Sequence, residues 1–479
     1  MSRQTRRMFL GHVAAAGLAP FSIQAQSPSP NDTIGVAVVG IGRKGPQHIK
    51  MFDEIPGVRV VALCDCDTRH LELGVAAAKG PVKTFTDYRK LLEHPGIDAV
   101  VIVTPDHWHA LMTVWACQAG KDVYVEKPVC HNHWEGRQMI RAARKYKRIV
   151  QAGTQNRSDV GLKAARPWLL GGGLGKIKLA RGFDMLGNRA IGKTNGPQPI
   201  PATADYDLFR GPAPMKPLRR ANLHYDWHYF YDTGTGDTAN RGAHTLDHIR
   251  WLIGCDALPT RLRSFSGRIG YADDGETPNT HVILYDTKPV PILWEMLGLM
   301  SEKGSSQRPT FRRMRTSMII ECEGGYLYGG RGGATAMDWN GKKIKRFDGD
   351  GGRNHQKNFI QAMRSRRKED LEAEILDGHI STAFCNLGLA SHQAGRHASP
   401  AELRQVCRGT PRPVGRNGSV ARAPRSQRCG SWGRTADHGR PGFRSEKRNV
   451  HGGGGGMGQH VQPPAVSPAF CPAGGGLSP

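Results

Sequence analysis

Short apolar runs alternate with segments of helical periodicity in the first third of the chain. The expected strands are residues 34–39, 58–64, 99–103, 122–125 and 149–152, and the expected helices are a segment ending at Phe52 and residues 108–119 and 134–147. Continuous apolar runs of this length are typical of parallel strands buried on both faces. The pattern predicts an α/β domain at residues 33–153 with the doubly wound parallel sheet of a Rossmann fold.

The pattern changes after residue 154, where few helices separate the later apolar runs. The expected strands there are residues 176–183, 260–266, 281–285, 291–296, 317–322 and 326–328. Consecutive strands should pair antiparallel, so we expect an α+β domain at residues 154–398 with a large, mostly antiparallel open sheet. Helices at residues 243–253 and 355–367 should cover one face. The other face remains available for substrate or for pairing of subunits in a homo-oligomer.

The N-terminal segment, residues 1–32, has the pattern of an export signal. Thr5-Arg6-Arg7-Met8-Phe9-Leu10 is a twin-arginine motif, followed by a modest apolar stretch, a cleavage site near residue 25 and a Ser/Pro linker. We therefore expect export to the periplasm by the twin-arginine machinery and removal of the signal. An uncleaved anchor or a chance arginine pair is the alternative.

The C-terminal segment, residues 399–479, has no apolar periodicity. Residues 401–479 hold twelve Lys or Arg against three Asp or Glu, and five consecutive glycines occupy positions 452–456. Such sequence cannot bury enough apolar surface to fold, so we expect a disordered basic tail. A frameshift is an alternative origin, which resequencing of the coding DNA would test.

The net charge of +26 raises the question of nucleic-acid binding. Outside the two ends, the basic residues are spread over several helices, without an aromatic-interleaved patch or a nucleic-acid motif. We therefore expect no nucleic-acid partner. The ten cysteines form no C-x-x-C pair and show no zinc-type spacing, so we expect no metal at these positions.

A glycine-rich turn follows the first expected strand. In a dinucleotide site Gly40 allows the tight turn, Gly42 lets the backbone approach pyrophosphate, and Gly45 lets the helix pack on the strand. The helix N-terminus then faces the phosphates. Asp65, at the end of the second strand, should bind the adenosine ribose and repel a 2′-phosphate. The motif predicts NAD in preference to NADP, and a plain glycine turn is the alternative.

Two later strand ends open onto the same crevice, where open α/β sheets bind their ligands. The residues there are Thr104, Pro105 and His109 after one strand, and Glu126 and Lys127 after the next. A lysine beside a nicotinamide can hydrogen-bond a substrate hydroxyl, and a lowered pKa would let it exchange that proton.

A helix in the second domain should carry the other half of the site. Asn240, His244, Asp247, His248 and Trp251 share one helix face, so several polar groups can project toward one ligand. Packing and capping roles for His244 and Asp247 are the alternative. A metal site at His244, Asp247 and His248 lacks a complete ligand set, so we expect none.

An aromatic segment at residues 224–231 precedes this helix. Its Tyr225 and Trp227 suit a sugar, which presents apolar ring faces together with hydroxyls. A buried aromatic cluster is the alternative.

In combination these motifs resemble the glucose-fructose oxidoreductase, inositol dehydrogenase and MocA family (Gfo/Idh/MocA). The resemblance runs from about residue 34 to about residue 395 and includes Gln155 and Arg157 in the run Ala152-Gly153-Thr154-Gln155-Asn156-Arg157. It implies that Lys127 is the catalytic lysine, that His244 is the active-site histidine, and that the second domain presents the substrate side. Many relatives carry an aspartate where this chain has Asn240, which cannot act as a base.

The sequence therefore predicts an exported NAD(P)-dependent oxidoreductase acting on a sugar, glycoside or polyol. Lys127 and His244 would move the hydroxyl proton during hydride transfer, with Asn240 beside them. Gln155 is assigned to the cofactor, and Arg157, Tyr225, Trp227 and Asp247 are assigned to the substrate. A periplasmic enzyme without free nicotinamide would keep NAD tightly bound. The alternatives are an NAD-dependent glycoside hydrolase or lyase, and an inactive NAD- or sugar-binding relative.

Overall fold

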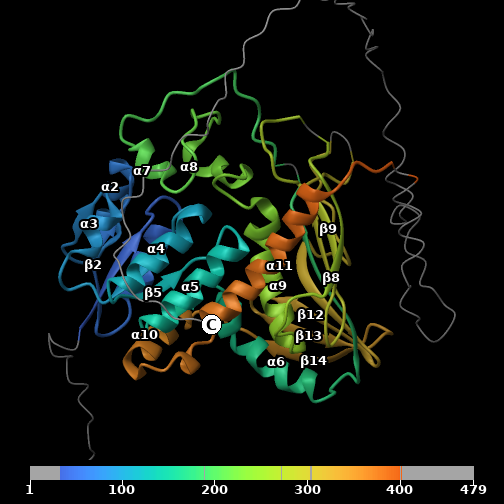
Figure 1. The fold of residues 1–479 in the computed structure, drawn as a ribbon. Helices are drawn as coiled ribbons and strands as arrows, with labels where there is room; N and C mark the ends of the chain where they lie inside the picture. Colours follow the sequence, from blue (N-terminus) through green and yellow to red (C-terminus); the bar gives the residue numbers. More distant parts are fainter. Residues whose placement is uncertain (1–32, 188, 271, 303–304, 400, 402–479) are drawn as a thin grey trace, which may run out of the picture. The chain divides into compact units, whose positions relative to one another are not determined.

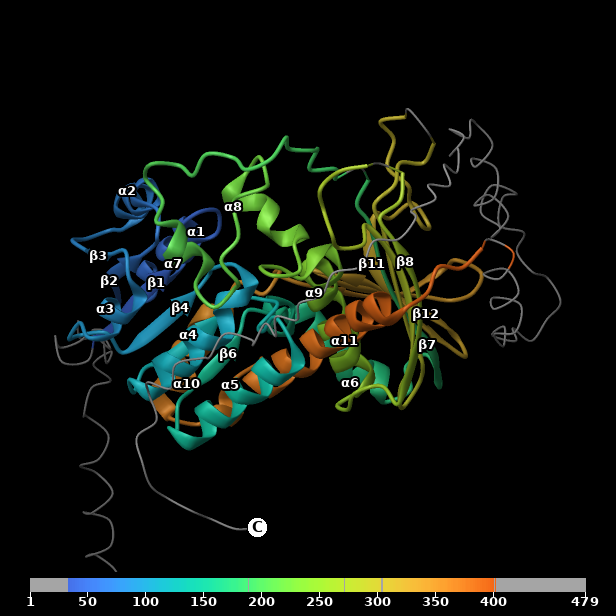
Figure 2. The same cartoon turned by 45° about the horizontal axis from the view of Figure 1, so that its top comes forward.

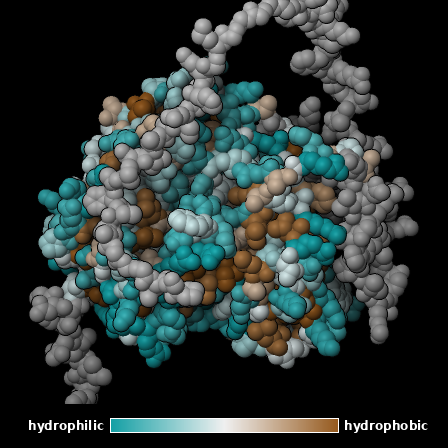
Figure 3. All heavy atoms as spheres, viewed as in Figure 1, coloured by the Kyte–Doolittle hydropathy of each residue, from teal (hydrophilic) through white to brown (hydrophobic). Residues whose placement is uncertain are grey.

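The computed structural model describes residues 33–401 except positions 188, 271, 303–304 and 400. The expected twin-arginine signal and nearly all of the expected basic tail lie outside these residues. No helix within the described ranges is long and apolar enough to cross a membrane. On the face drawn in Figure 3, hydrophilic residues are interspersed with separate hydrophobic patches.

The first domain is built on a six-stranded parallel sheet. Its elements are β1 (Ile34–Val39), α1 (Gly45–Asp53), β2 (Val58–Cys64), α2 (Thr68–Ala77), β3 (Lys83–Phe85), α3 (Tyr88–Leu92), β4 (Ala99–Ile102), α4 (Asp106–Gln118), β5 (Asp122–Val125), α5 (His133–Lys145) and β6 (Val150–Ala152). The strand order is β3-β2-β1-β4-β5-β6, the Rossmann order. Separate apolar clusters pack on its two faces, so every residue of β4 and β5 is buried.

The second domain is built on an eight-stranded sheet (Figures 1 and 2). Its elements are η2 (Gln155–Ser158), α6 (Val160–Leu170), β7 (Ile177–Met185), α7 (Tyr206–Arg210), α8 (Leu223–Asp226), η3 (Trp227–Tyr229), α9 (Gly236–Ile253), β8 (Arg261–Gly267), β9 (Thr280–Asp286), β10 (Ile292–Leu297), β11 (Thr316–Cys322), β12 (Gly325–Gly330), β13 (Gly333–Met337), β14 (Lys343–Asp348), α10 (His355–Ser365), η4 (Lys368–Asp370) and α11 (Ile375–Ala394). The order is β14-β13-β12-β11-β7-β10-β9-β8, and every pair is antiparallel except β7 with β10. The predicted fold class is confirmed.

Two details of the second domain differ from the sequence-based expectation. Consecutive strands do not always pair, because β7 lies in the middle of the sheet, between β10 and β11. The expectation that the helix at residues 355–367 covers this sheet is wrong. In α10, Phe359, Ile360 and Met363 instead join the apolar cluster of the first domain. Residues 373–374 also bond to the edge strand β6, so the chain returns to the Rossmann sheet before α11.

The helices α6, α9 and α11 cover one face of the eight-stranded sheet. Alternate residues of the strands, such as Ile283, Trp294 and Ile320, point into the apolar cluster beneath them. The side chains on the opposite face form a smaller cluster around Phe183 and Ile319. The N-terminal half of α9 reaches the Rossmann domain, and this places its side chains opposite the end of β5.

Candidate active site

A cleft of ≈ 1540 Å³ lies at the carboxyl ends of the Rossmann strands and extends to α9 and β12. Most of the predicted site residues line it. These are Gly40, Gly42, Asp65, Thr104, Pro105, His109, Glu126, Lys127, Gln155, Tyr225, Trp227, Asn240 and His244. Gly45, Arg157 and Asp247 do not line it. The structure thus brings together residues up to about 200 positions apart at the crevice expected for an open α/β sheet.

The turn after β1 requires glycine for two physical reasons. Gly40 has a φ of +87°, and a Cβ there would lie 2.7 Å from the main-chain oxygen of Val103. A Cβ on Gly45 would lie 2.7 Å from the oxygen of Gly40. Gly45 therefore lets α1 approach the turn and does not itself face the cleft. The turn and the helix N-terminus fit the pyrophosphate of a dinucleotide.

Asp65 anchors this turn to the end of β2. Its Oδ2 accepts the Ile41 N–H at 2.6 Å, and its Oδ1 accepts the Asp67 N–H at 2.9 Å. His70 Nδ1 lies 3.3 Å from Oδ2. The carboxylate lines the cleft as the sequence suggests, but it also fixes the glycine turn, a role that the motif alone does not reveal.

The loops after β4 and β5 are tied together by His109. Its Nδ1 lies 2.7 Å from the oxygen of Pro128, and its Nε2 lies 2.8 Å from the oxygen of Thr104. Both ring nitrogens are therefore engaged with the main chain. His109 holds the two strand ends, including Thr104 and Pro105, at a fixed separation, rather than offering a free ring nitrogen to a ligand.

Lys127 emerges from the end of β5 and contacts α9. Its Nζ donates to the main-chain oxygen of Asn240 and to its Oδ1, both at 3.0 Å. Burial lowers the pKa of Lys127, and the negative charge of Glu126 opposes that shift. An amine in this setting gives up its proton more readily than an exposed lysine does.

Glu126 is a buried anion beside the lysine. Its Oε1 accepts hydrogen bonds from His48 Nε2 and Gln155 Nε2, each at 3.0 Å. Burial would raise the pKa of Glu126, but the His48 hydrogen bond and the charges of His48 and Lys127 hold it well below its usual range. Sequence reasoning missed His48, since a histidine inside α1 carries no signal that it will face the end of β5.

His244 lies one helical turn beyond Asn240. Burial and the positive charge of Lys127 lower its pKa to about 3, so the ring is neutral at pH 7. Its Nδ1 is buried and has no hydrogen-bond partner within the described residues. A buried polar atom without a partner is costly, so a ligand hydroxyl would relieve this deficit.

Asn240 connects the lysine to a second buried acid. Its Oδ1 accepts from Lys127, and its Nδ2 donates to Asp237 Oδ1 at 3.3 Å. Asp237 is itself paired with Arg189 at 3.3 Å. The amide therefore orients Lys127 without serving as a base. Sequence reasoning also missed Asp237, which lies one turn earlier on α9.

The assignment of Arg157 and Asp247 to the substrate is corrected by their placement. The guanidinium Nε of Arg157 donates to both carboxylate oxygens of Asp247, at 3.0 and 2.9 Å. Ser381 donates to the same carboxylate at 2.7 Å, and Asp377 lies 3.2 Å from the guanidinium. Because Asp247 faces η2 and α11 rather than the cleft, the pair holds the second domain together.

Tyr225 and Trp227 line the cleft from the segment that precedes α9. The guanidinium of Arg43 lies 4.6 Å from the centre of the Tyr225 ring. Trp227 stacks on His228, with ring centres 3.6 Å apart. Both aromatic faces are thus partly covered by the protein, and their contact with a sugar remains a prediction.

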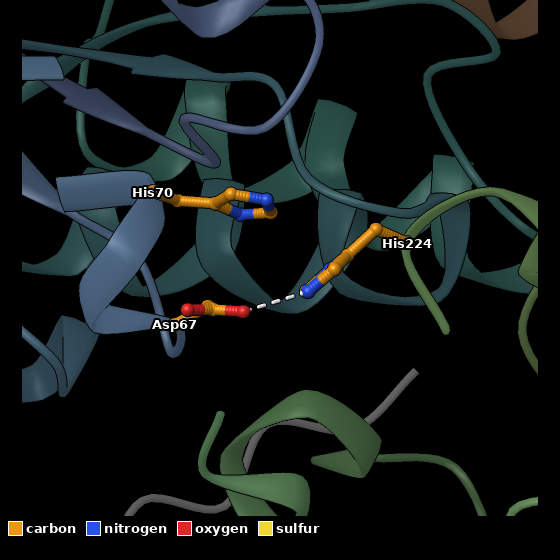
Figure 4. A group of neighbouring side chains, drawn as sticks. All are labelled: Asp67, His70 and His224. Atoms are coloured by element: carbon orange, nitrogen blue, oxygen red, sulfur yellow. Dashed lines mark hydrogen bonds and ion pairs between the residues drawn. The ribbon is translucent and has the colours of Figure 1, made fainter. Parts of the chain in front are cut away.

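One group in the described residues has the residue types and spacing of a metal site. It consists of Asp67, His70 and His224 (Figure 4). His70 lies 3.3 Å from Asp65, and both histidines line the cleft. The group that the sequence analysis set aside, His244 with Asp247 and His248, is not of this kind. There Asp247 is bound to Arg157, and His248 Nδ1 accepts from Asn156 at 3.0 Å.

Comparisons with known proteins agree with this fold. Residues 34–154 match the model "Oxidoreductase family, NAD-binding Rossmann fold", and residues 166–263 match "Oxidoreductase family, C-terminal alpha/beta domain". Over 148 residues the chain is 34% identical to scyllo-inositol 2-dehydrogenase (NAD(+)) of Bacillus subtilis, covering 31% of this chain and 43% of that protein. Over 106 residues it is 35% identical to a glycosyl hydrolase family 109 protein of Shewanella pealeana, covering 20% of this chain and 23% of that protein.

These matches span less than half of the length of either curated relative. Among solved structures, the WlbA dehydrogenase of Bordetella pertussis, crystallised with NADH and UDP-GlcNAcA, superposes with a TM-score of 0.58. That match has 18% identity and covers 76% of this chain and 97% of that one, so it supports the fold. In succession, therefore, residues 34–154 and 166–263 are similar to the NAD-binding Rossmann domain and the C-terminal α/β domain of the Gfo/Idh/MocA oxidoreductase family.

Proposed function

We propose that this protein oxidises a secondary alcohol of a sugar, glycoside or polyol with NAD. The observation that carries the proposal is that Lys127, at the end of β5, and His244, on α9, line the same cleft. Bound NAD would supply the hydride acceptor. The substrate's C–H electron pair leaves with the hydride, and its O–H proton must go to a group of the protein.

Lys127 is the proposed acceptor of that proton. The lowered pKa makes the neutral amine accessible, and nearby Glu126 stabilises the ammonium formed when the proton arrives. Asn240 holds the amine in place through two hydrogen bonds. His244 is neutral, so its role is to pair with the substrate hydroxyl and orient it.

The preference for NAD over NADP is part of the proposal. Asp65 presents a carboxylate at the end of β2, where a 2′-phosphate would meet a like charge.

Tight retention of the cofactor and export through the twin-arginine pathway are further proposals from the sequence. We also propose, from the sequence, a homo-oligomer formed through the eight-stranded sheet. Light scattering on the purified protein measures its subunit number.

An NAD-dependent glycosidase or lyase is the second candidate, favoured by the match to a glycosyl hydrolase family 109 protein. In that reaction transient oxidation would acidify the neighbouring C–H and permit elimination of the aglycone, without net change in NAD. The same Lys127 and His244 would serve the oxidation step. Product analysis separates the two functions, since a dehydrogenase yields a keto sugar and NADH, whereas a glycosidase releases free aglycone.

The test begins with protein purified without added cofactor. After denaturation, mass spectrometry identifies any released nucleotide, and calorimetry measures NAD and NADP binding by the emptied protein. A panel of sugars follows, including acidic ones, because Arg241, Arg331 and Arg353 line the substrate end of the cleft. Absence of both bound NAD and NAD binding would overturn the proposal, and binding without turnover on the panel would favour an inactive relative.

A further inference from the structure

A long connection between β7 and α9 folds back over the Rossmann domain. We call residues 189–235 the crossing segment; it contains α7, α8 and η3 (Figures 1 and 2). Its main chain bonds to the loop after β2, with Asp205 N donating to Cys66 O at 2.8 Å and Thr68 N donating to Thr203 O at 3.0 Å. The crossing segment therefore lies against the rim of the cleft beside Asp65.

At this contact three side chains converge from both sides. Asp67 and His70 come from the start of α2, and His224 comes from α8 on the crossing segment (Figure 4). One ligand atom of each lies within 4.8 Å of the other two. His224 Nε2 lies 2.8 Å from Asp67 Oδ2, and the two imidazole centres are 4.1 Å apart.

Neighbouring groups orient two of these side chains as ligands. Asp67 caps α2 by accepting the Arg69 N–H on Oδ1 at 3.0 Å, so Oδ2 is the oxygen turned toward the histidines. His70 Nδ1 lies 3.3 Å from Asp65 Oδ2. A carboxylate on one ring nitrogen fixes the tautomer and frees the other nitrogen, as around many metal-bound histidines.

We propose that Asp67, His70 and His224 bind a divalent transition-metal ion, of which Zn²⁺ is the model, and that this ion pins the crossing segment to the Rossmann domain. Two imidazoles and one carboxylate suit Zn²⁺ and similar ions rather than Mg²⁺ or Ca²⁺, which prefer oxygen ligands. A tetrahedral Zn²⁺ site places its ligand atoms about 3.4 Å apart. The three ligand atoms, which lie within 4.8 Å of one another, would draw together to that spacing around the ion.

The position of the site suggests what the ion would do. His70 and His224 line the cleft, whereas Asp67 lies behind them with 3% of its surface exposed. With three protein ligands, a fourth coordination position faces the cleft next to Asp65. The ion would hold the crossing segment closed at the proposed adenosine end and slow the release of bound nucleotide. Only this effect on release rests on the proposed function.

Metal binding is tested on the full-length protein after treatment with a chelator and desalting. Co²⁺ is titrated as a spectroscopic probe, followed by displacement with Zn²⁺, and the metal content is measured by elemental analysis. We expect one ion per chain and visible absorption bands of a low-symmetry Co²⁺ site, with no competition from Mg²⁺. Absent or Mg²⁺-sensitive binding would overturn the proposal.

Three variants assign the ion to this group. His224→Ala and His70→Ala should each weaken Co²⁺ and Zn²⁺ binding by more than about 10-fold, because even changes to groups that only orient the ligands cost about 10-fold to 100-fold. Asp67→Asn should do the same while keeping the helix cap, since Asn caps helices as well as Asp. His397→Ala, at an exposed position, is the matched control. Equal affinity in all four variants would place the ion elsewhere and refute the proposal.

The proposed pinning of the crossing segment by the ion is tested by the rate at which NAD dissociates and by limited proteolysis of the crossing segment. Added Zn²⁺ should slow both processes in the wild type but not in His224→Ala. If NAD does not bind at all, the proposed function is refuted. The metal site is then judged by the metal titrations and by the protection of the crossing segment from proteolysis. If Zn²⁺ binds but the rate of proteolysis of the crossing segment is unchanged, the ion does not pin this segment and that part of the proposal is refuted.

Discussion

The buried pair of Arg157 and Asp247 gives a sharp test of the corrected assignment. Asp247 is fully buried and paired with Arg157, and the Ser381 hydroxyl that donates to its carboxylate accepts a hydrogen bond from the buried Arg250. Replacing Asp247 with Asn keeps the shape but removes the negative charge. Among the described residues, Asp377, which is 34% exposed, then remains as the ion-pair partner of the buried Arg157. Breaking a buried pair on one side costs about 3–5 kcal/mol, and the remaining acid favours the lower end, about 3 kcal/mol.

Urea unfolding at pH 7, followed by circular dichroism, measures this cost. With an m-value of about 3 kcal/mol/M, a loss of about 3 kcal/mol lowers the midpoint by about 1 M. The matched control is Asp286→Asn, which breaks the exposed pair of Asp286 with Arg261. Exposed pairs contribute about 0–1 kcal/mol, so this midpoint should barely move. If Asp247→Asn behaved like the control and instead raised KM for the substrate, the reasoning would be refuted and the sequence-based assignment restored.

The same pair predicts a pH dependence of stability. Burial would raise the pKa of Asp247, but Arg157 and the hydrogen bonds from Arg157 and Ser381 lower it below its ordinary value of 3.8. A carboxylate whose pKa is lowered on folding contributes stability above the unfolded pKa, and this contribution is lost as the pH falls through the folded value. The difference in midpoint between wild type and Asp247→Asn should therefore be constant from pH 8 to pH 5 and shrink below about pH 4.

The remaining predictions concern the cleft. Lys127→Met should lower kcat about 10²-fold to 10⁴-fold, the usual contribution of acid–base catalysis, with NAD affinity nearly unchanged by calorimetry; Lys357→Met, exposed on α10, is the control. Because the neutral amine of Lys127 accepts the proton, the oxidation rate should rise with pH through a pKa below 10.5. The pKa of His244 is about 3, so a rate step between pH 5 and 8 that disappears in His244→Gln would contradict this assignment. Gly40→Ala puts a Cβ 2.7 Å from a strand-end carbonyl at a φ of +87° and should reduce both NAD affinity and melting temperature. Asp65→Ser should raise the ratio of NADP to NAD affinity at least about tenfold, equivalent to 1.4 kcal/mol, and an unchanged ratio would remove Asp65 from cofactor selection.

The sequence determined most of the Rossmann half of this protein, although it did not reveal α2, the short strand β3 or α3. Strands buried on both faces are mostly apolar, so β1, β2, β4 and β5 are visible as runs in the sequence, within a residue of their observed bounds. A residue that directly follows such a strand must lie at the carboxyl edge of the sheet. For that reason the sequence alone places Lys127 and Asp65 at one crevice.

The strands β13 and β14 show where local sequence fails. Gly333–Met337 is made of small and mixed residues, and Lys343–Asp348 is exposed at all but one position. Neither has the apolar alternation of a half-buried strand. The edge strand β14 owes its place to hydrogen bonds with β13, and β13 is buried between β12 and β14 with small residues that carry little strand signal. Likewise, the sequence of α10 shows an apolar face, but it does not reveal which of the two sheets this helix packs against.

Only the tertiary structure decided which polar groups meet. Arg157 and Asp247 are 90 residues apart, and His224 is 157 residues from Asp67, yet each pair is within hydrogen-bonding distance. Helix periodicity placed Asp247 on the same face as His244, but its carboxylate does not line the cleft and accepts a hydrogen bond from Ser381 of α11 instead. Charge pairing depends on distances and burial set by the whole packed fold, whereas strand hydrophobicity and glycine turns are enforced locally at every residue.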